Sequence, residues 1–463
     1  MARHRSRRTT FAKDPEVDRS LRHSISDGVF FSAMVGGAEG YFSAFAVFLK
    51  ASTAQIGVLA SLPPLLASFS QLLSAWLGRR TGRRKPIIVF GALLQAVTLF
   101  PLALLPWWFP EQAVPLLILS AIVYFVGPNL GSPQWSSLMG DLVPESRRGR
   151  FFALRTRLCS LASFTALIGA GLVLHGSNEL GLTYWGFVAV FLAGAAARFA
   201  SAWHLQRMLD PGGHVAALEA PWHADLWHGL RSTGLLPFSL FHASMQLAVG
   251  IASPFFVLYM LRDLGFSYLE FMINTAASVC VQFLTLNRWG RLSDLFGNRL
   301  ILLTTGSVIP FLPALWLLST NYYYLLAVQA ASGLVWAGFT LSATNFVFDL
   351  TPPARRATLM AVHNVLAAAA VFVGAVIGGW LGTHLPTSTN LFGDEISWLS
   401  PLYGVFAISA LARLLVAGAF LPRLKEVRRA RPMSMSGLIF RVTRVHPVSG
   451  MIFEIVTRRK KDE

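Results

Sequence analysis

The chain has 463 residues, of which 54% are hydrophobic and only 13% are charged, and its mean hydropathy is +0.54. Soluble domains carry about twice this charged fraction, so the composition excludes an ordinary soluble protein. A net charge of +17 would suggest nucleic-acid binding in a soluble chain. Here the basic residues follow the connections between apolar segments, which argues against a nucleic-acid partner.

Twelve apolar stretches are long enough to cross roughly 30 Å of hydrocarbon. They are continuously apolar rather than alternating, so they predict transmembrane helices and not a barrel. The stretches lie near residues 26–49, 54–77, 86–108, 114–139, 151–175, 182–206, 233–261, 268–289, 299–319, 322–349, 357–383 and 398–421. The predicted fold is therefore an all-α polytopic membrane protein with twelve transmembrane helices.

The distribution of basic residues predicts the orientation of these helices. With twelve crossings, 35 of the 39 Lys and Arg residues fall on one side of the membrane, and only Lys50 and Arg262 fall on the other. Because positive charge accumulates on the cytoplasmic side, both termini are predicted to be cytoplasmic. We expect a multi-pass protein of a bacterial cytoplasmic membrane.

An internal repeat divides the chain into two halves. Residues 215 positions apart are identical at several places, and a second offset of 208 relates another group. The first offset pairs Leu77, Gly82, Arg84 and Gly91 with Leu292, Gly297, Arg299 and Gly306, and the second pairs Asp141, Leu142, Pro144, Arg147 and Arg148 with Asp349, Leu350, Pro352, Arg355 and Arg356. Such a duplication in an apolar chain is typical of two-lobed secondary transporters.

The repeat predicts five regions. They are a basic cytoplasmic N-terminal segment (1–23), a six-helix bundle (24–206), a cytoplasmic linker (207–231), a second six-helix bundle (232–422) and a basic cytoplasmic tail (423–463). Apolar clusters interleaved with Arg suggest that the tail lies on anionic lipids, and a disordered basic tail is the alternative. The linker histidines match no metal-ligand spacing, so we expect no metal and no cofactor.

Residues 290–299 read Gly-Arg-Leu-Ser-Asp-Leu-Phe-Gly-Asn-Arg, with Asp four residues after the first Gly and then a Gly and a basic residue. This pattern resembles the signature loop of the major facilitator superfamily, and the chain looks most like uncharacterised bacterial members of that family. The counterpart at 76–85 has Arg79 where the family has Asp, and residues 141–150 resemble the loop between helices four and five. The resemblance implies two pseudo-symmetric bundles and a transporter rather than an enzyme.

The resemblance also implies a cytoplasmic gate. Asp294 ends a helix, where its carboxylate can meet Arg299 and the start of the fifth helix near Gly149. A solvated turn without a gating role is the alternative. The gating residues implied by the matching loops are Gly290, Asp294, Gly297, Arg299, Gly82, Arg83, Arg84, Asp141, Arg148, Asp349 and Arg356.

Glu39 lies about halfway along the first predicted helix, among Gly36, Gly37 and Gly40. An ionisable group inside a span is costly and usually functional. A carboxylate at this depth resembles the proton site of drug–proton antiporters in the superfamily, although their helix-five Gly-Pro motif is absent. We therefore predict that Glu39 couples transport to protons. A structural, permanently protonated Glu39 is the alternative.

Other charged residues within the spans occur at matched positions. Asp27 and His242 correspond at the 215 offset, and they form either a second titrating pair or two wet residues near the headgroups. Arg155 corresponds to His363 at the 208 offset, and either pairs with Asp27 or Asp141 or contacts an anionic substrate. Two further arginines are interpreted as snorkelling toward the cytoplasm, namely Arg198 and Arg413.

In the family, helices 1, 4, 7 and 10 line a central cavity. The resemblance therefore implies a set of cavity residues, of which each alone is more often an interhelical hydrogen-bonding group. They are Tyr41, Gln134, Trp135, Gln246, Trp336 and Asn345, to which Arg155 and His363 are added. Few polar groups and several aromatic rings favour an amphipathic substrate over a hexose.

We therefore predict a monomeric, proton-coupled secondary transporter that moves a small organic solute by alternating access, with export preferred. A uniporter, or a symporter that imports a sugar or an organic ion, is the first alternative. A non-transporting membrane receptor is the second. No nucleophile–base pair, metal cluster or phosphate loop predicts an enzyme.

Overall fold

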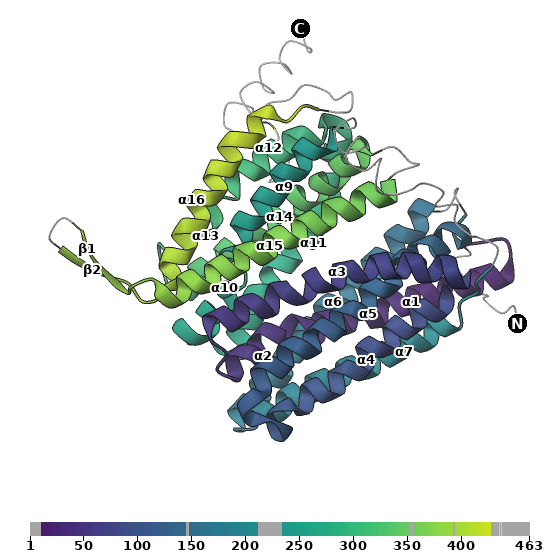
Figure 1. Cartoon of the computed structure of the whole chain (residues 1–463), viewed down its shortest axis with the longest axis horizontal. Helices are drawn as coiled ribbons and strands as arrows, with labels where there is room; N and C mark the ends of the chain where they lie inside the picture. The colour runs from purple at the N-terminus through teal and green to yellow at the C-terminus, as the bar shows by residue number, and fades with distance from the viewer. Residues whose placement is uncertain are drawn as a thin grey trace, which may run out of the picture. The chain divides into compact units, whose positions relative to one another are not determined.

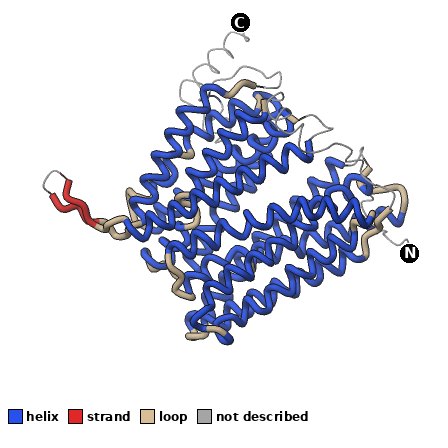
Figure 2. Tube along the Cα trace, in the orientation of Figure 1, coloured by secondary structure: helices blue, strands red, loops and turns tan. Residues whose placement is uncertain are grey.

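The computed structural model describes residues 11–144, 148–211, 234–351, 356–391 and 394–426, with residues 435 and 437. Almost all of these residues are helical, as Figure 2 shows. The helices of the first half are α1 (Pro15–Gly37), α2 (Phe42–Phe48), α3 (Thr53–Thr81), α4 (Lys85–Trp108), α5 (Ala113–Leu142), α6 (Arg148–Glu179) and α7 (Thr183–Gln206). Those of the second half are α9 (Leu235–Gly250), α10 (Phe255–Leu258), α11 (Tyr268–Phe296), α12 (Asn298–Val308), α13 (Phe311–Leu315), α14 (Tyr322–Leu350), α15 (Arg356–His384) and α16 (Leu402–Phe420) (Figure 1).

The all-α polytopic fold is confirmed. Within the described residues, 11 helical segments are long and apolar enough to cross a membrane. The first predicted span is not among them, because α1 begins at Pro15 and carries Glu16, Asp18, Arg22 and Asp27. The helix thus begins 11 residues before the predicted stretch at 26–49, and several of the added residues are charged.

The first helix is interrupted where its glycines cluster. Here α1 ends at Gly37, a single 3₁₀ turn η1 covers Glu39–Tyr41, and α2 continues the chain from Phe42. At Gly36 a Cβ atom would collide with the carbonyl group of Ser163 in α6. The two backbones can approach this closely only because Gly36 has no side chain. Glu39 lies three residues after this close contact, at the break in the helix.

Two compact units make up the chain. Unit 1 comprises Met1–Pro221, Gly250–Ala276 and Asn364–Val405, and unit 2 comprises Trp222–Val249, Ala277–His363 and Phe406–Glu463. Unit 1 therefore contains segments from both predicted halves. The domain boundaries predicted from the repeat stay a prediction.

Within unit 1, the N-terminal end of α3, shortly after Lys50, packs against segments of the second half. A Cβ on Gly57 would lie 2.7 Å from the carbonyl oxygen of Ala375 in α15. Arg262, in the single-turn π-helix η4 (Tyr259–Asp263), has its Nη1 3.5 Å from the hydroxyl oxygen of Thr53. We call this group of contacts the outer contact, because the sequence predicts that Lys50 and Arg262 lie on the non-cytoplasmic side.

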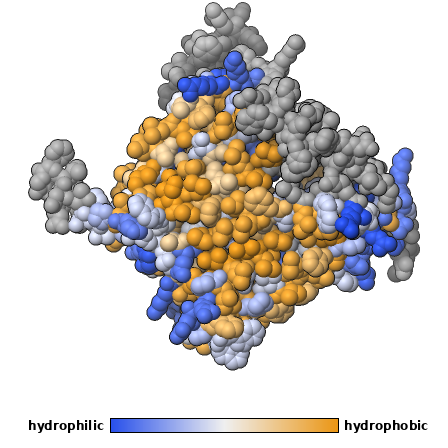
Figure 3. Space-filling model, in the orientation of Figure 1, coloured by the Kyte–Doolittle hydropathy of each residue, from blue (hydrophilic) through white to orange (hydrophobic). Residues whose placement is uncertain are grey.

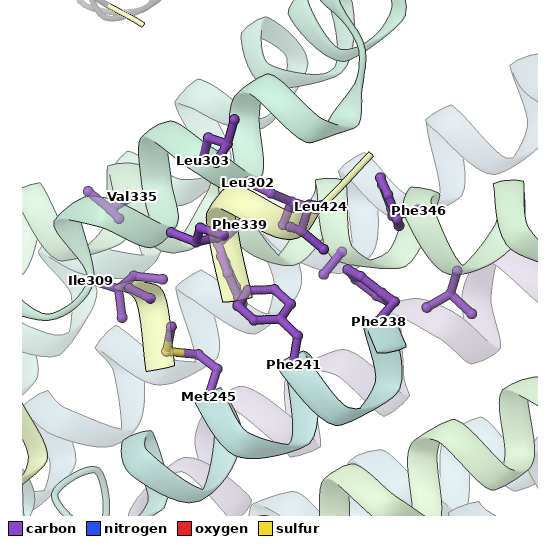
Figure 4. Packing of buried hydrophobic residues seen from close by; sticks show 14 of the residues in the cluster. Phe238, Phe241, Met245, Leu302, Leu303, Ile309, Val335, Phe339, Phe346 and Leu424 are labelled. Atoms are coloured by element: carbon purple, nitrogen blue, oxygen red, sulfur yellow. The ribbon is translucent and has the colours of Figure 1, made fainter. Parts of the chain in front are cut away.

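Each unit has its own apolar core. In unit 2, side chains of α9, α12, α14 and the segment after α16 pack together, with Phe238, Phe241 and Phe339 among them (Figure 4). In unit 1, a cluster joins Phe11 and Phe151 to side chains of α4, α5 and α7. Large apolar side chains are also exposed on the helices, as expected for surfaces in contact with lipid (Figure 3).

A short hairpin follows α15, in a stretch where the sequence predicts a loop between two spans. Its strands are β1 (Ser388–Leu391) and β2 (Asp394–Ser397), which pair antiparallel with Ser388 opposite Ser397. At its base, Trp398 donates from its backbone N–H to the carbonyl of Thr387, 2.8 Å away, and from its indole N–H to that of Pro386, 2.9 Å away.

Candidate functional site

Asp27 of α1 is at the centre of a buried charged cluster. Only 4% of the residue is exposed. Ser201 donates to its Oδ1 at 2.7 Å, and Arg198 has its Nη1 4.0 Å from the same oxygen. Arg155 of α6 has its Nη2 3.4 Å from Oδ2. One carboxylate thus faces two guanidinium groups, which come from α6 and α7.

Local packing positions both arginines of this cluster. The Nε of Arg155 donates to the carbonyl of Ser24 at 3.1 Å, and its guanidinium carbon lies 4.4 Å from the centroid of the Trp135 ring. A Cβ on Gly28 would lie 2.7 Å from the Nη2 of Arg155, so glycine at this position makes room for the guanidinium. Arg198 donates to Ser201 at 2.6 Å and lies over the Phe31 ring.

Glu39 has different surroundings. The fully buried Tyr124 of α5 donates its hydroxyl hydrogen to Oε2 of Glu39 at 3.0 Å. The Tyr124 oxygen also lies 3.5 Å from the sulfur of Met34. Among the described residues no cation forms an ion pair with Glu39. The two carboxylates of the first helix therefore differ, because Asp27 faces two cations and Glu39 faces a neutral hydroxyl.

The matched positions of the second half carry imidazoles. His242 of α9 and His363 of α15 stack with ring centroids 4.9 Å apart, and the Nδ1 of His363 lies 2.8 Å from the hydroxyl oxygen of Ser239. In the described part of the chain, the buried Nδ1 of His242 has no hydrogen-bond partner. Pairing between His242 and Asp27, which belong to different units, stays a prediction.

Two interpretations of the intramembrane charges are wrong. Arg198 and Arg413 do not snorkel, because they are only 5% and 2% exposed. Arg413 instead has two nitrogens 3.4 Å from the carbonyl oxygens of Ile309 and Val249. Asp27 is not a wet residue near the headgroups, because two arginines bury it. Arg155 does pair with Asp27, as one of the alternatives predicted.

The predicted cavity residues of the first half make internal contacts. Tyr41 is fully buried and donates its hydroxyl hydrogen to the carbonyl of Leu167 at 2.8 Å. Gln134 donates to the carbonyl of Ser74, also at 2.8 Å. Trp135 is half-buried beneath Arg155. Tyr41 and Gln134 thus hold helices together in this structure, whereas Trp135 belongs to the charged cluster.

The predicted cavity residues of the second half are each half-buried. Asn345 has its Nδ2 3.4 Å from the hydroxyl oxygen of Ser293, and Trp336 packs edge-on against Phe339. Gln246 is on α9, one turn beyond His242. A role of these residues in a shared cavity stays a prediction.

Arg84 anchors the predicted cytoplasmic ends of three first-half segments. It is 6% exposed and forms ion pairs with Asp141 at 2.6 Å and Asp210 at 3.0 Å. Burial lowers the pKa of Arg84, but the hydrogen bonds and charges of the two carboxylates outweigh it and raise the pKa above its ordinary value. Next to it, Gly82 ends α3 with a φ of +61°, and Arg83 is exposed.

The expected contact between Asp294 and Arg299 is not made. Asp294 is exposed near the end of α11, while Arg299 donates from Nε to the carbonyl of Leu424 at 2.5 Å and from its backbone to Glu426 at 2.9 Å. Asp349 accepts a hydrogen bond from Asn298 at 3.0 Å. The arginine turns toward the segment after α16, because that segment supplies both acceptors.

The remaining predicted gating residues lie at or near helix ends, apart from Gly290. Gly290 lies inside α11, and Gly297 adopts a φ of +83° between α11 and α12. Arg148 and Arg356 begin α6 and α15, and their side chains lie outside the described residues. Most of the linker and of the basic tail also lies outside them. The gate contact of Asp294 with the fifth helix stays a prediction.

Sequence reasoning missed two members of the site, Tyr124 and Ser201. Ser201 follows Arg198 by three residues, which is the spacing of one helical turn, so that spacing was a usable signal. Tyr124 lies in an apolar stretch of α5, 85 positions from Glu39. Nothing in the spacing of the two residues indicates their contact.

Comparison with known proteins agrees with this fold. The family model described as Major Facilitator Superfamily matches residues 28–245 and again residues 238–454. The chain belongs to the major facilitator superfamily. Because the two matches fall on the two predicted halves, the duplication and the resemblance of the signature loops are both explained. Members of this family are transport proteins and not enzymes, so the chain is a multi-pass membrane transporter of a small solute.

Individual relatives are distant. The major facilitator-type transporter psiT2 of Psilocybe cubensis is 29% identical over 136 residues, which cover 29% of this chain and a quarter (25%) of that relative. A D-xylose-proton symporter has a TM-score of 0.68 at 13% identity, covering 90% of this chain and 99% of that one. The nucleoside transporter NupG has a TM-score of 0.64 at 15% identity, covering 89% of this chain and 100% of its own. At these identities the structures show the shared fold alone.

Proposed function

We propose that this transporter is proton-coupled, works by alternating access, and uses Glu39 as its proton-binding group. The observation that carries the proposal is the contact of Glu39 with Tyr124 at a break in the first helix. Asp27 is paired with two guanidinium groups, whereas Glu39 accepts from a hydroxyl and has no cationic partner among the described residues. An ionised carboxylate without a cation is costly within a membrane, and proton binding removes that cost.

The helix break supports a moving site. Residues 39–41 form a single 3₁₀ turn between α1 and α2, so the backbone at Glu39 is not held by a continuous α-helical ladder. A small change in the relation of α1 to α2 would change the distance of Glu39 from Tyr124. Gain or loss of a proton at Glu39 is thereby linked to helix position, which is what coupling by alternating access requires.

The outer contact supports a state that is closed on the non-cytoplasmic side. Beside it, Asp263 accepts a hydrogen bond from the hydroxyl of Ser400 at 2.5 Å. Closure there is one of the two end states of alternating access. We propose a bacterial cytoplasmic membrane as the location. We propose that both termini are cytoplasmic, because 35 of the 39 Lys and Arg residues fall on their side under the twelve-helix topology.

For direction and substrate we propose export of an amphipathic organic compound. The aromatic surroundings of the charged cluster, Trp135 and Phe31, support an amphipathic rather than a sugar-like ligand. The competing function is that of a uniporter, or of a symporter that imports a sugar or an organic ion, and the shared fold is compatible with both directions. Export can be distinguished from import by comparing solute uptake into everted membrane vesicles with solute uptake into intact cells.

The proton site can be tested without knowing the substrate. Infrared difference spectra of the purified protein between acidic and alkaline buffer should contain a protonated-carboxyl band that disappears in Glu39→Gln. The exposed Glu179 at the end of α6 gives the matched control, Glu179→Gln, which should keep the band. In proteoliposomes, Glu39→Gln should still exchange solute but should no longer respond to a pH gradient. Undiminished gradient-driven transport by Glu39→Gln would refute the proposal.

A further inference from the structure

The charged cluster of unit 1 contains more positive than negative charge. Arg155 and Arg198 contribute two positive charges, and Asp27 contributes one negative charge. Glu39 does not complete the balance, because its hydrogen-bond partner is Tyr124 and not an arginine. The cluster as described therefore carries one unneutralised positive charge in an apolar region, where an unpaired charge is costly.

The excess charge is most accessible at Arg155. Arg198 is 4.0 Å from Asp27 and reaches it through Ser201, because Arg198 donates to Ser201 at 2.6 Å and Ser201 donates to Asp27 at 2.7 Å. Arg155 is 3.4 Å from Asp27, a long distance for a hydrogen bond between charged groups. Its side chain is 18% exposed, against 6% for Arg198. Arg155 is thus the cation that an anion can reach more easily.

Trp135, which lies beneath Arg155, offers a hydrogen-bond donor. The indole N–H of Trp135 is buried, and within the described residues it has no hydrogen-bond partner. The ring of the same residue lies 4.4 Å below the guanidinium carbon of Arg155. Buried polar groups in proteins are nearly always paired, so an unpaired N–H next to an excess positive charge points to an acceptor that is absent here.

We propose that Arg155 and Trp135 form the binding site for the carboxylate of the transported solute, which is therefore an amphipathic organic anion. That this anion is the transported solute rests on the proposed function. An anionic oxygen would accept from the guanidinium and the indole and would neutralise the cluster. The aromatic ring gives the apolar part of the solute a surface to pack on. Gly28 keeps the space in which the guanidinium lies.

Binding is tested with the purified full-length protein and matched pairs of probes, benzoate with benzamide and indole-3-acetate with its amide. At least one carboxylate should raise the unfolding temperature, and its amide should not. In Arg155→Gln the apparent affinity should fall at least about tenfold, the loss expected for one hydrogen bond to a charged group. Arg155→Lys keeps the charge and should bind more weakly than wild type but more strongly than Arg155→Gln. In Trp135→Phe, which keeps the ring, affinity should fall a few-fold.

The matched control is Arg157→Gln. Arg157 is an exposed arginine of α6 two residues away, and its loss should leave the affinity unchanged. Equal stabilisation by carboxylates and amides, or full affinity in Arg155→Gln, would overturn the proposal. So would loss of benzoate binding in phosphatidylglycerol vesicles with retention in phosphatidylcholine vesicles, because the anionic headgroup of phosphatidylglycerol would then occupy the site. These readouts need no pH gradient, so their failure is separate from a failure of proton coupling at Glu39.

Discussion

The two halves of this transporter place different chemistry at matched positions. At the offset of 215, Asp27 corresponds to His242 and Arg198 to Arg413, and at the offset of 208, Arg155 corresponds to His363. The first half joins its three residues around one carboxylate. In the second half, the two histidines stack on each other and Arg413 contacts backbone carbonyls.

The difference shows what the duplication has kept and what it has lost. Both halves keep a serine at the same place, since Ser24 contacts Arg155 and Ser239 contacts His363. The position of the polar site is therefore retained while its charge is not. An uncharged imidazole needs no counterion, whereas a guanidinium group in a buried site does, and Asp27 provides one for the two arginines of the first half. We infer that ion and solute binding are concentrated in the first half.

The largest expected effect separates the two buried arginines. Arg198→Leu should lower the free energy of unfolding by about 3 kcal/mol, because it removes a guanidinium that Asp27 and Ser201 need in a buried site. Arg413→Leu should change it by less than about 1 kcal/mol, because Arg413 has only two carbonyl contacts of 3.4 Å and a buried Nε without a partner in the described chain.

The measurement is chemical unfolding of both variants in the same detergent, followed by tryptophan fluorescence. Equal losses for the two variants would show that the carboxylate of Asp27 is not what distinguishes the halves. A second leucine variant, at the exposed Arg157, sets the baseline for removing a surface arginine of the first half.

A smaller effect is expected where helices touch through glycine. Gly91 and Gly306 are matched at the offset of 215. A Cβ at Gly91 would collide with the backbone carbonyl of Gly127 in α5, whereas at Gly306 it would lie 3.1 Å from the side-chain methyl groups of Leu421. A side chain can shift and a helix backbone cannot do so easily. Gly91→Ala should cost about 2 kcal/mol, and Gly306→Ala less than half of that, by thermal unfolding.

Much of the fold could be predicted from the sequence, because the signals are local. Apolar length and basic connections indicate the spans, and the offset of 215 indicates the duplication. The length of the first helix could not be predicted in this way. Its first turns carry Glu16, Asp18 and Arg22, and Asp14 caps it, so it extends beyond the apolar stretch. The hairpin at 388–397 has no span-like signal and was missed.

The site could be predicted only in part. A sequence indicates how deeply a charged residue lies within a membrane span, but it does not indicate which residues that side chain contacts. Glu39, Asp27 and Arg155 were found because a charge within an apolar stretch is conspicuous. Tyr124 and Ser201 were missed, because which helix faces which is decided by packing between helices. The same reason explains the error over snorkelling, since a chain position does not show whether an arginine faces lipid or a neighbouring helix.

The anchoring arginines give the next comparison. Arg84 and Arg299 are matched, but Arg84 holds two carboxylates through its side chain, while Arg299 holds one carbonyl through its side chain and Glu426 through its backbone. Arg84→Gln should lower stability by about 1 kcal/mol, because the partners are partly exposed. Arg299→Gln should cost about half as much, since its backbone contact survives. Hydrogen exchange at the starts of α4 and α12 measures both, and a larger loss at α12 would contradict the comparison.

The smallest effect concerns pH. His23 of α1 has its Nδ1 2.9 Å from the Nδ1 of His204, and the matched residues of the second half are Phe238 and Ala419. Burial first, and then the charges of His204 and Arg207, hold the pKa of His23 below its ordinary value of 6.5. The unfolded chain then binds more protons than the folded one, so this contribution is complete above pH 6.5 and is lost as the pH falls through it.

The loss should be less than about 1 kcal/mol, because His23 is partly exposed to solvent. Thermal unfolding of the wild type between pH 8 and pH 5 should contain this component, and His23→Phe, which copies the second half, should remove it. The exposed His384 offers the control, since His384→Gln should leave the pH profile of the wild type intact. If His23→Phe and wild type lose stability in parallel as the pH falls, the two Nδ1 atoms do not compete for a proton, and the halves do not differ in pH response at this pair of positions.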